Sequence, residues 1–124
     1  MIRIDYQDKR PIYEQVIERL QNLIVRGILK ADEKLPSVRN LAIELSINPN
    51  TIQRAYVELE RMGLIYTVKG KGNYVAENQI WMINEKANAL KDLEKALEQI
   101  KTLGVSEEEM MDFVKKTYRK GREE

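Results

Sequence analysis

Hydrophobic residues near the start of the chain recur at helical spacing. From Ile12 to Ile24 they form a continuous stripe, with Pro11 at the expected first turn and Gly27 just past the end. This pattern predicts a helix whose apolar face lies in the core. In residues 2–6 apolar and polar positions alternate instead, which predicts a short extended segment that lies along the domain.

Two shorter helical patterns follow. Ser37 is placed to cap the first, expected over 38–45, and Asn48 is placed to cap the second. Pro49 falls in the first turn of the second helix, where a missing N–H costs nothing, and Gly63 allows a left-handed turn at its end. Two helices joined by so short a turn are typical of a helix-turn-helix.

The next stretch favours β structure. Leu64 to Val68 and Asn73 to Val75 flank the sequence Lys69-Gly70-Lys71-Gly72, which predicts a hairpin, the wing of a winged helix-turn-helix. Residues 28–35 contain turn formers and apolar anchors, so they are a candidate for a short third strand. The expected fold is therefore mostly α with a small β-hairpin, and the winged helix-turn-helix domain is expected over residues 1–76.

Residues 77–124 are expected to form a separate helical tail. A long helix is predicted over 79–103, then Gly104, then a last helix that begins with a capping box of Ser106 and Glu109. The charged residues 115–124 are expected to fray. Both helices carry apolar stripes that could fold back on the protomer, but a second copy of the chain would cover both, so we expect a two-fold homodimer. The predicted interface residues are Ile83, Leu90, Leu93, Leu97, Ile100, Phe113 and Val114.

Composition excludes several classes of chemistry. Cysteine and histidine are absent, which removes disulfides, thiol redox chemistry, ordinary zinc sites and histidine-based acid/base catalysis. We therefore expect neither an enzyme nor a cofactor. No apolar run approaches the roughly 18 residues that span a bilayer, and no secretion-signal pattern is present, so we expect a cytoplasmic protein with no membrane partner.

The net charge of +1 does not by itself indicate a nucleic-acid partner, so the placement of charges matters more. The apolar stripe of the second short helix leaves polar side chains facing outward near its N-terminus. Arginine suits guanine, asparagine and glutamine suit adenine, and threonine can contact a thymine methyl group. Basic residues gather at the helix starts and the hairpin tip, where phosphates would lie. Any one such residue is usually only solvated, but the order of the elements favours double-stranded DNA as the partner.

Several motifs resemble the GntR family of bacterial transcription regulators. They are Arg10-Pro11-Ile12-Tyr13-Glu14-Gln15, Leu35-Pro36-Ser37-Val38-Arg39-Asn40-Leu41-Ala42, Asn48-Pro49-Asn50-Thr51, Arg54-Ala55-Tyr56 and Gly70-Lys71-Gly72. The resemblance covers about Tyr6 to Ala76, and the short tail is similar to that of the YtrA-type subgroup. It implies a winged-helix domain, a homodimer formed by the C-terminal helices, and repression of genes that often encode ABC transporters.

The resemblance also implies which residues touch DNA, in agreement with the polar positions above. One departure is Pro49, where many members carry an arginine, so their operator sequence does not carry over. The predicted DNA-binding residues are Ser37, Arg39, Asn50, Thr51, Gln53, Arg54, Lys69, Lys71 and Gly72.

Two further hypotheses stay open at this point. The winged helix could instead bind another protein, through Glu44, Glu58 and Glu60 beside the second short helix. A small-molecule effector could bind between the tail helices, with Trp81, Phe113 and Tyr118 as candidate walls. Aromatic residues at helical spacing are, however, more often part of a core.

Overall fold

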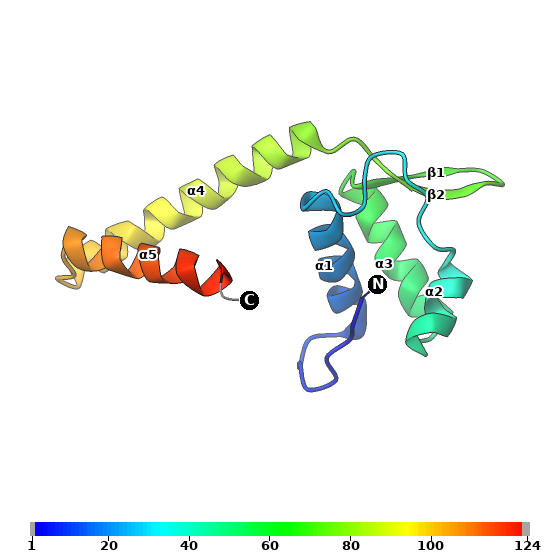
Figure 1. Cartoon of the computed structure of the whole chain (residues 1–124), viewed down its shortest axis with the longest axis horizontal. Coiled ribbons are helices and arrows are strands. Elements are labelled where there is room, and N and C mark those ends of the chain that lie inside the picture. The colour runs from blue at the N-terminus through cyan, green and yellow to red at the C-terminus, as the bar shows by residue number, and fades with distance from the viewer. Residues whose placement is uncertain (1, 123–124) are drawn as a thin grey trace. The chain divides into compact units, whose positions relative to one another are not determined.

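The computed structural model describes residues 2–122, and within them helices and one hairpin follow in the predicted order (Figure 1). The elements are α1 (Ile12–Val25), α2 (Val38–Leu45), α3 (Pro49–Arg61), β1 (Ile65–Val68), β2 (Gly72–Val75), α4 (Gln79–Thr102) and α5 (Glu107–Arg122). They form two compact units that divide between Ile83 and Asn84. The predicted fold class, a winged helix-turn-helix with a helical tail, is confirmed.

The core of the first unit lies where α1 and α2 pack on α3 (Figure 1). The apolar stripe of α1 is buried as predicted, and it meets the stripe of α3 formed by Ile52, Ala55, Tyr56 and Leu59. Leu64 and Val75 extend the core beneath the hairpin. Since each helix buries one face only, the opposite face of α3 stays free for a partner.

Local side-chain chemistry sets the limits of α2 and α3. The Ser37 hydroxyl accepts a hydrogen bond of 3.0 Å from the backbone N–H of Asn40, and the Asn48 side chain accepts one of 2.8 Å from that of Asn50. Ser46 ends α2 in the left-handed conformation, with φ at 56°. Both predicted caps and the tight turn between the helices are confirmed.

The hairpin pairs β1 and β2 antiparallel, from Ile65 opposite Val75 to Val68 opposite Gly72. The candidate third strand is reduced to one bridge between Lys34 and Tyr74. Asp32 has a positive φ of 68° on one side of this bridge, and Pro36 lacks an N–H on the other. The segment makes three backbone hydrogen bonds with β2: Asp32 N–H donates to Val75, Val75 N–H to Glu33 and Leu35 N–H to Asn73.

The N-terminal segment is tied to α1 through the buried amide of Gln15. This amide accepts from the N–H of Asp5 at 2.9 Å and donates to its carbonyl at 3.0 Å. Ile2 is buried and Ile4 packs on the core, as the alternation predicted, but Tyr6 is 68% exposed. The alternation fails at Tyr6 because a turn begins there.

The second unit is the helical pair of α4 and α5. Gly104 ends α4 with a φ of 83°, and the Ser106 hydroxyl accepts from the N–H of Glu109 at 3.1 Å, as predicted. The expectation that residues 115–124 fray is wrong as far as residue 122, and residues 123–124 lie outside the described part. Lys116 pairs with Asp112 one turn earlier at 3.0 Å, so the charges of this segment support the helix.

The tail begins as part of the first unit. Trp81, in the first turns of α4, is half-buried and packs against the core of the winged helix. The two units divide after Ile83, whereas the sequence predicts the DNA-binding domain over residues 1–76. Within residues 2–122, no helix is both long enough and apolar enough to cross a membrane.

Candidate nucleic-acid interface

The N-terminal half of α3 presents polar side chains on its free face. Asn50, Gln53 and Arg54 are exposed, and Thr51 is half-buried at the edge of the apolar stripe. The Asn48 cap satisfies the Asn50 N–H but leaves the Asn50 side chain without a role in the cap. The positive end of the helix dipole also favours a phosphate here. This arrangement suits a helix that enters the major groove of DNA with its N-terminus.

Arg54 is exposed, but its guanidinium group lies against α1. The guanidinium carbon lies 3.7 Å from the centre of the Tyr13 ring, a close cation–π contact. The two residues line a shallow hollow with Glu14, Ile17, Glu58 and Met62. The sequence did not predict this contact.

Arg61, two turns further along α3, is held differently. Its guanidinium group donates to the carboxylate of Glu58, and the Nε bond is 2.8 Å long. This pairing holds the pKa of Glu58 below its ordinary value, with a further contribution from the charge of Arg54. Glu58, one of the three acidic residues in the hypothesis of a protein-binding surface, is thus engaged mainly by Arg61.

Lysines surround the hairpin turn. Lys69 and Lys71 are exposed at the tip, where the N–H of Lys71 closes the turn on the carbonyl of Val68 at 2.9 Å. Gly72 has a φ of 130°, and a side chain there would approach the Cε atom of Lys34 to 3.0 Å. Glycine at this position therefore lets the Lys34 side chain lie across the hairpin.

Lys34 was missed by the sequence argument. The bridge to Tyr74 holds its backbone against β2, and its side chain brings a third lysine close to the hairpin turn. Its approach to Gly72 joins two segments that are distant in the sequence. The sequence signal for this meeting is the candidate third strand within residues 28–35.

The beginning of α2 carries the two remaining predicted residues. Ser37 and Arg39 are both exposed. The Ser37 oxygen accepts the capping bond, so its hydroxyl proton stays available for a phosphate oxygen. In a helix-turn-helix the first helix crosses the DNA backbone, so the exposed position of Arg39 is compatible with a phosphate contact.

Tyr56 links α3 to the segment that leads into α2. Its hydroxyl donates a hydrogen bond of 2.8 Å to the carbonyl of Pro36, directly before the α2 cap. Burial raises the pKa of Tyr56 to about 12, and the negative charge of Glu44 adds to the shift. The geometry of the pair is therefore fixed from within the core.

The second unit holds a hollow of about 550 Å³ between α4 and α5. It is lined mainly by apolar residues, namely Leu97, Ile100, Val105, Met110, Met111 and Val114, with Lys101, Ser106 and Glu107 at its edges. The three aromatic residues predicted as ligand walls do not line it. Trp81 packs on the first unit instead, while Phe113 and Tyr118 are 64% and 70% exposed.

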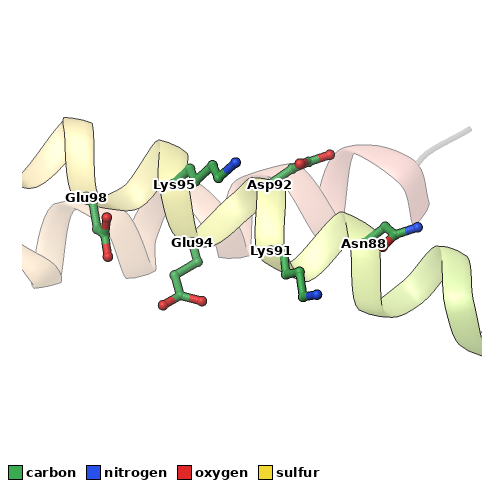
Figure 2. Close-up of a pocket in the computed structure, with 6 residues that line it drawn as sticks. All are labelled: Asn88, Lys91, Asp92, Glu94, Lys95 and Glu98. Carbon is green, nitrogen blue, oxygen red and sulfur yellow. The ribbon is translucent and has the colours of Figure 1, made fainter.

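A second hollow of the tail runs along α4 alone. Figure 2 shows its six residues, Asn88, Lys91, Asp92, Glu94, Lys95 and Glu98, with side chains that point in different directions. All are polar and exposed, and they do not converge on a common centre. This surface has the character of a solvated helix face.

Comparison with known proteins agrees with this geometry. Residues 12–75 match the family described as "Bacterial regulatory proteins, gntR family". The chain belongs to this family. The GntR-family chain is 40% identical to the HTH-type transcriptional repressor YtrA of Bacillus subtilis over 117 residues, which are 93% of this chain and 90% of that protein. The predicted resemblance, including that to the YtrA-type subgroup, is confirmed. The relatives of this chain are transcriptional regulators rather than enzymes.

Solved structures extend the likeness of this GntR-family chain to three dimensions. A GntR family transcriptional regulator from Listeria monocytogenes superposes with a TM-score of 0.71 at 41% identity, covering 88% of this chain and 96% of that one. The DNA-binding domain of AraR, solved in complex with its operator ORE1, superposes with a TM-score of 0.53 at 32% identity. It covers 59% of this chain and 89% of its own.

Proposed function

We propose that this GntR-family DNA-binding regulator is a homodimeric repressor that recognises a pseudo-palindromic operator. One observation carries the proposal: the capped N-terminus of α3 presents exposed Asn50, Gln53 and Arg54 on the face opposite the core. The similarity to YtrA, named a transcriptional repressor, and to an operator-bound domain supports the same reading. Such a protein acts where the bacterial chromosome lies, in the cytoplasm.

In this proposal α3 reads base edges in the major groove. The side-chain amides of Gln53 and Asn50 each carry an acceptor and a donor that complement the N6–H donor and N7 acceptor of adenine. The guanidinium group of Arg54 can donate two hydrogen bonds to O6 and N7 of guanine. Thr51 lies beside them and can contact a thymine methyl group or a base edge. Each good bidentate contact would give about 1–3 kcal/mol of discrimination.

Residues outside α3 would position the protein on the DNA backbone. Arg39 and Ser37 lie at the beginning of α2, while Lys69, Lys71 and Gly72 form the hairpin tip, and Lys34 lies across the hairpin. Contacts with phosphates carry no sequence information, but they set affinity and make it strongly dependent on salt. The wing lysines could also reach the minor groove beside the recognition site.

We propose that the second unit forms the dimer. Its apolar side chains lack cover in the single chain, with Leu90 59%, Leu93 49% and Phe113 64% exposed. The predicted interface consists of these residues with Leu97, Ile100 and Val114, and it also includes Ile83, the last residue of the first unit. A second copy is the occupant that best fits an apolar surface on both helices, because a two-fold axis places like surfaces face to face. Two recognition helices then meet two half-sites about one DNA turn apart.

The apolar hollow between α4 and α5 bears on the effector hypothesis. A small molecule that binds between the tail helices would occupy this hollow, lined by Met110 and Met111, and would not be walled by the three candidate aromatic residues. A second copy of the tail competes for the same surface. ABC-transporter genes are the proposed targets, on the strength of the resemblance to the YtrA-type subgroup.

The test is to incubate the purified full chain with fragmented genomic DNA of its source at near-physiological salt and to sequence the retained fragments. We expect a few promoter fragments that share an inverted repeat. If no fragment were enriched above random DNA, the result would contradict the proposal. In that case the winged helix would be better explained as a protein-binding module, which has no reason to select DNA.

A further inference from the structure

We infer that Tyr13, on α1, is a positioning residue for base recognition by Arg54, on α3. The inference rests on the proposed function, because it assigns a role to a residue outside the recognition helix in what that helix reads. Tyr13 does not belong to the predicted DNA-binding set. Its proposed role comes only from its contact with Arg54, whose guanidinium carbon lies 3.7 Å from the centre of the Tyr13 ring.

The geometry of a cation–π contact leaves the arginine able to read a base. In a stacked cation–π contact the ring covers one face of the planar guanidinium group and the N–H donors point outward within its plane, and the 3.7 Å distance fits this arrangement. Among the hydrogen bonds of residues 2–122, none uses the Arg54 side chain as donor. Tyr13 therefore orients the fork without consuming its donors.

Arg61 on the same helix shows the alternative. Its donors are directed at the carboxylate of Glu58, so they are occupied before any DNA arrives. Glu58 lies one turn from Arg54 and contributes an attraction to it, but the hydrogen bonds go to Arg61. Glu58 therefore accepts its hydrogen bonds from Arg61, whereas the guanidinium group of Arg54 packs on the Tyr13 ring.

Holding Arg54 in one orientation should favour specific binding. A free arginine side chain loses conformational entropy when it forms a bidentate contact, because several of its bonds can no longer rotate. A side chain that is already stacked loses less conformational entropy. On random DNA, where no guanine is correctly placed, this ordering brings no advantage. Tyr13 should consequently affect the preference for the operator rather than general affinity for DNA.

The experiment compares Tyr13→Phe, which keeps the aromatic face, with Tyr13→Leu, which keeps an apolar group of similar size for the half-buried site. Tyr6→Leu, at a 68% exposed position of the N-terminal segment, is the matched control. The probes are the duplex that the wild-type protein selects from a random-sequence library and a shuffled duplex of the same composition. Near-identical thermal unfolding of the variants shows that the fold is kept.

We expect Tyr13→Leu to weaken binding to the selected duplex about two- to fivefold, the range of an exposed cation–π contact, with little change on the shuffled duplex. Tyr13→Phe and Tyr6→Leu should bind like wild type. In an Arg54→Ala background, Tyr13→Leu should have no further effect, because the residue through which it acts is gone.

Three results would overturn the inference: no loss with Tyr13→Leu, an equal loss on both duplexes, or an undiminished loss in the Arg54→Ala background. The last two would reduce Tyr13 to a structural role in packing α1. A failure of the proposed function looks different, because the wild-type protein itself would then select no duplex from the library.

Discussion

The hydroxyl of Tyr56 on α3 donates a hydrogen bond of 2.8 Å to the carbonyl oxygen of Pro36, directly before the cap of α2. Removing it with Tyr56→Phe should lower the free energy of unfolding of the first unit by about 1 kcal/mol, since the Pro36 carbonyl loses its donor. Trp81 packs on this unit, so the emission of this single tryptophan follows its unfolding in urea. Tyr6→Phe, at an exposed site, should unfold like wild type. The same unfolding midpoint for Tyr56→Phe and wild type would contradict the assignment.

The same tyrosine predicts a loss of stability in alkali. Burial and the charge of Glu44 raise the pKa of Tyr56 from 10.0 to about 12 in the folded protein. A raised pKa favours the folded state as long as the phenol stays protonated in both states. This contribution is complete below about pH 10 and is lost as the pH rises toward 12.

The pKa of Tyr66 is also raised, because its hydroxyl donates a hydrogen bond to Asp32, and this contribution is common to wild type and Tyr56→Phe. The difference between wild type and Tyr56→Phe removes these common effects. The stability advantage of wild type should shrink as the pH rises from 10 to 12. An advantage that stays constant across this interval would show that Tyr56 does not titrate as described.

The α3 cap allows helix stability and DNA binding to be separated. Asn48→Ala removes the acceptor for the Asn50 N–H and should cost about 1 kcal/mol of stability. Asn48→Asp keeps an acceptor and places a negative charge where the helix dipole favours it, so stability should be retained. The same charge would repel DNA phosphates.

We therefore expect Asn48→Asp to weaken binding to selected and shuffled duplexes alike, as fluorescence anisotropy would measure. Its unfolding in urea, followed in parallel, serves as the control for a change in fold. Unchanged DNA affinity for Asn48→Asp would mean that the N-terminus of α3 does not approach the DNA backbone.

Dimer formation is tested by placing a charge on the apolar surface of the second unit. Leu93 is 49% exposed in the single chain, and Leu93→Glu should turn the dimer into a monomer in sedimentation velocity runs. Lys95→Glu, on the polar surface shown in Figure 2, is the matched control and should leave the dimer intact. A dimer that survives Leu93→Glu would place the interface elsewhere.

Features governed by neighbouring residues could be predicted from the sequence. The caps of Ser37 and Asn48 depend on backbone groups only two or three residues away, and the hairpin follows from a glycine-rich turn between β-favouring runs. The exposed polar positions of α3 likewise follow from its apolar stripe, because helical periodicity fixes both faces together.

Contacts between distant segments could not be predicted in this way. Tyr13 meets Arg54, and Lys34 meets Gly72, only after the helices have packed and the hairpin has formed. The division between the two compact units lies after Ile83, within α4, and only packing shows that Trp81 belongs to the first unit. The charge of residues 115–124 predicts fraying, but charges one helical turn apart can pair, as Lys116 does with Asp112.

The most direct test of the account is a salt series of binding titrations with wild type and Gln53→Ala on the selected duplex and its shuffled counterpart. Wild type should prefer the selected duplex, and log K should fall with log salt at a slope of roughly −7 if four cations of each protomer meet phosphates. Gln53→Ala should lose about 1–3 kcal/mol on the selected duplex and little on the shuffled one. Equal binding of wild type to both duplexes, or a slope near zero, would contradict a sequence-reading interface on α3.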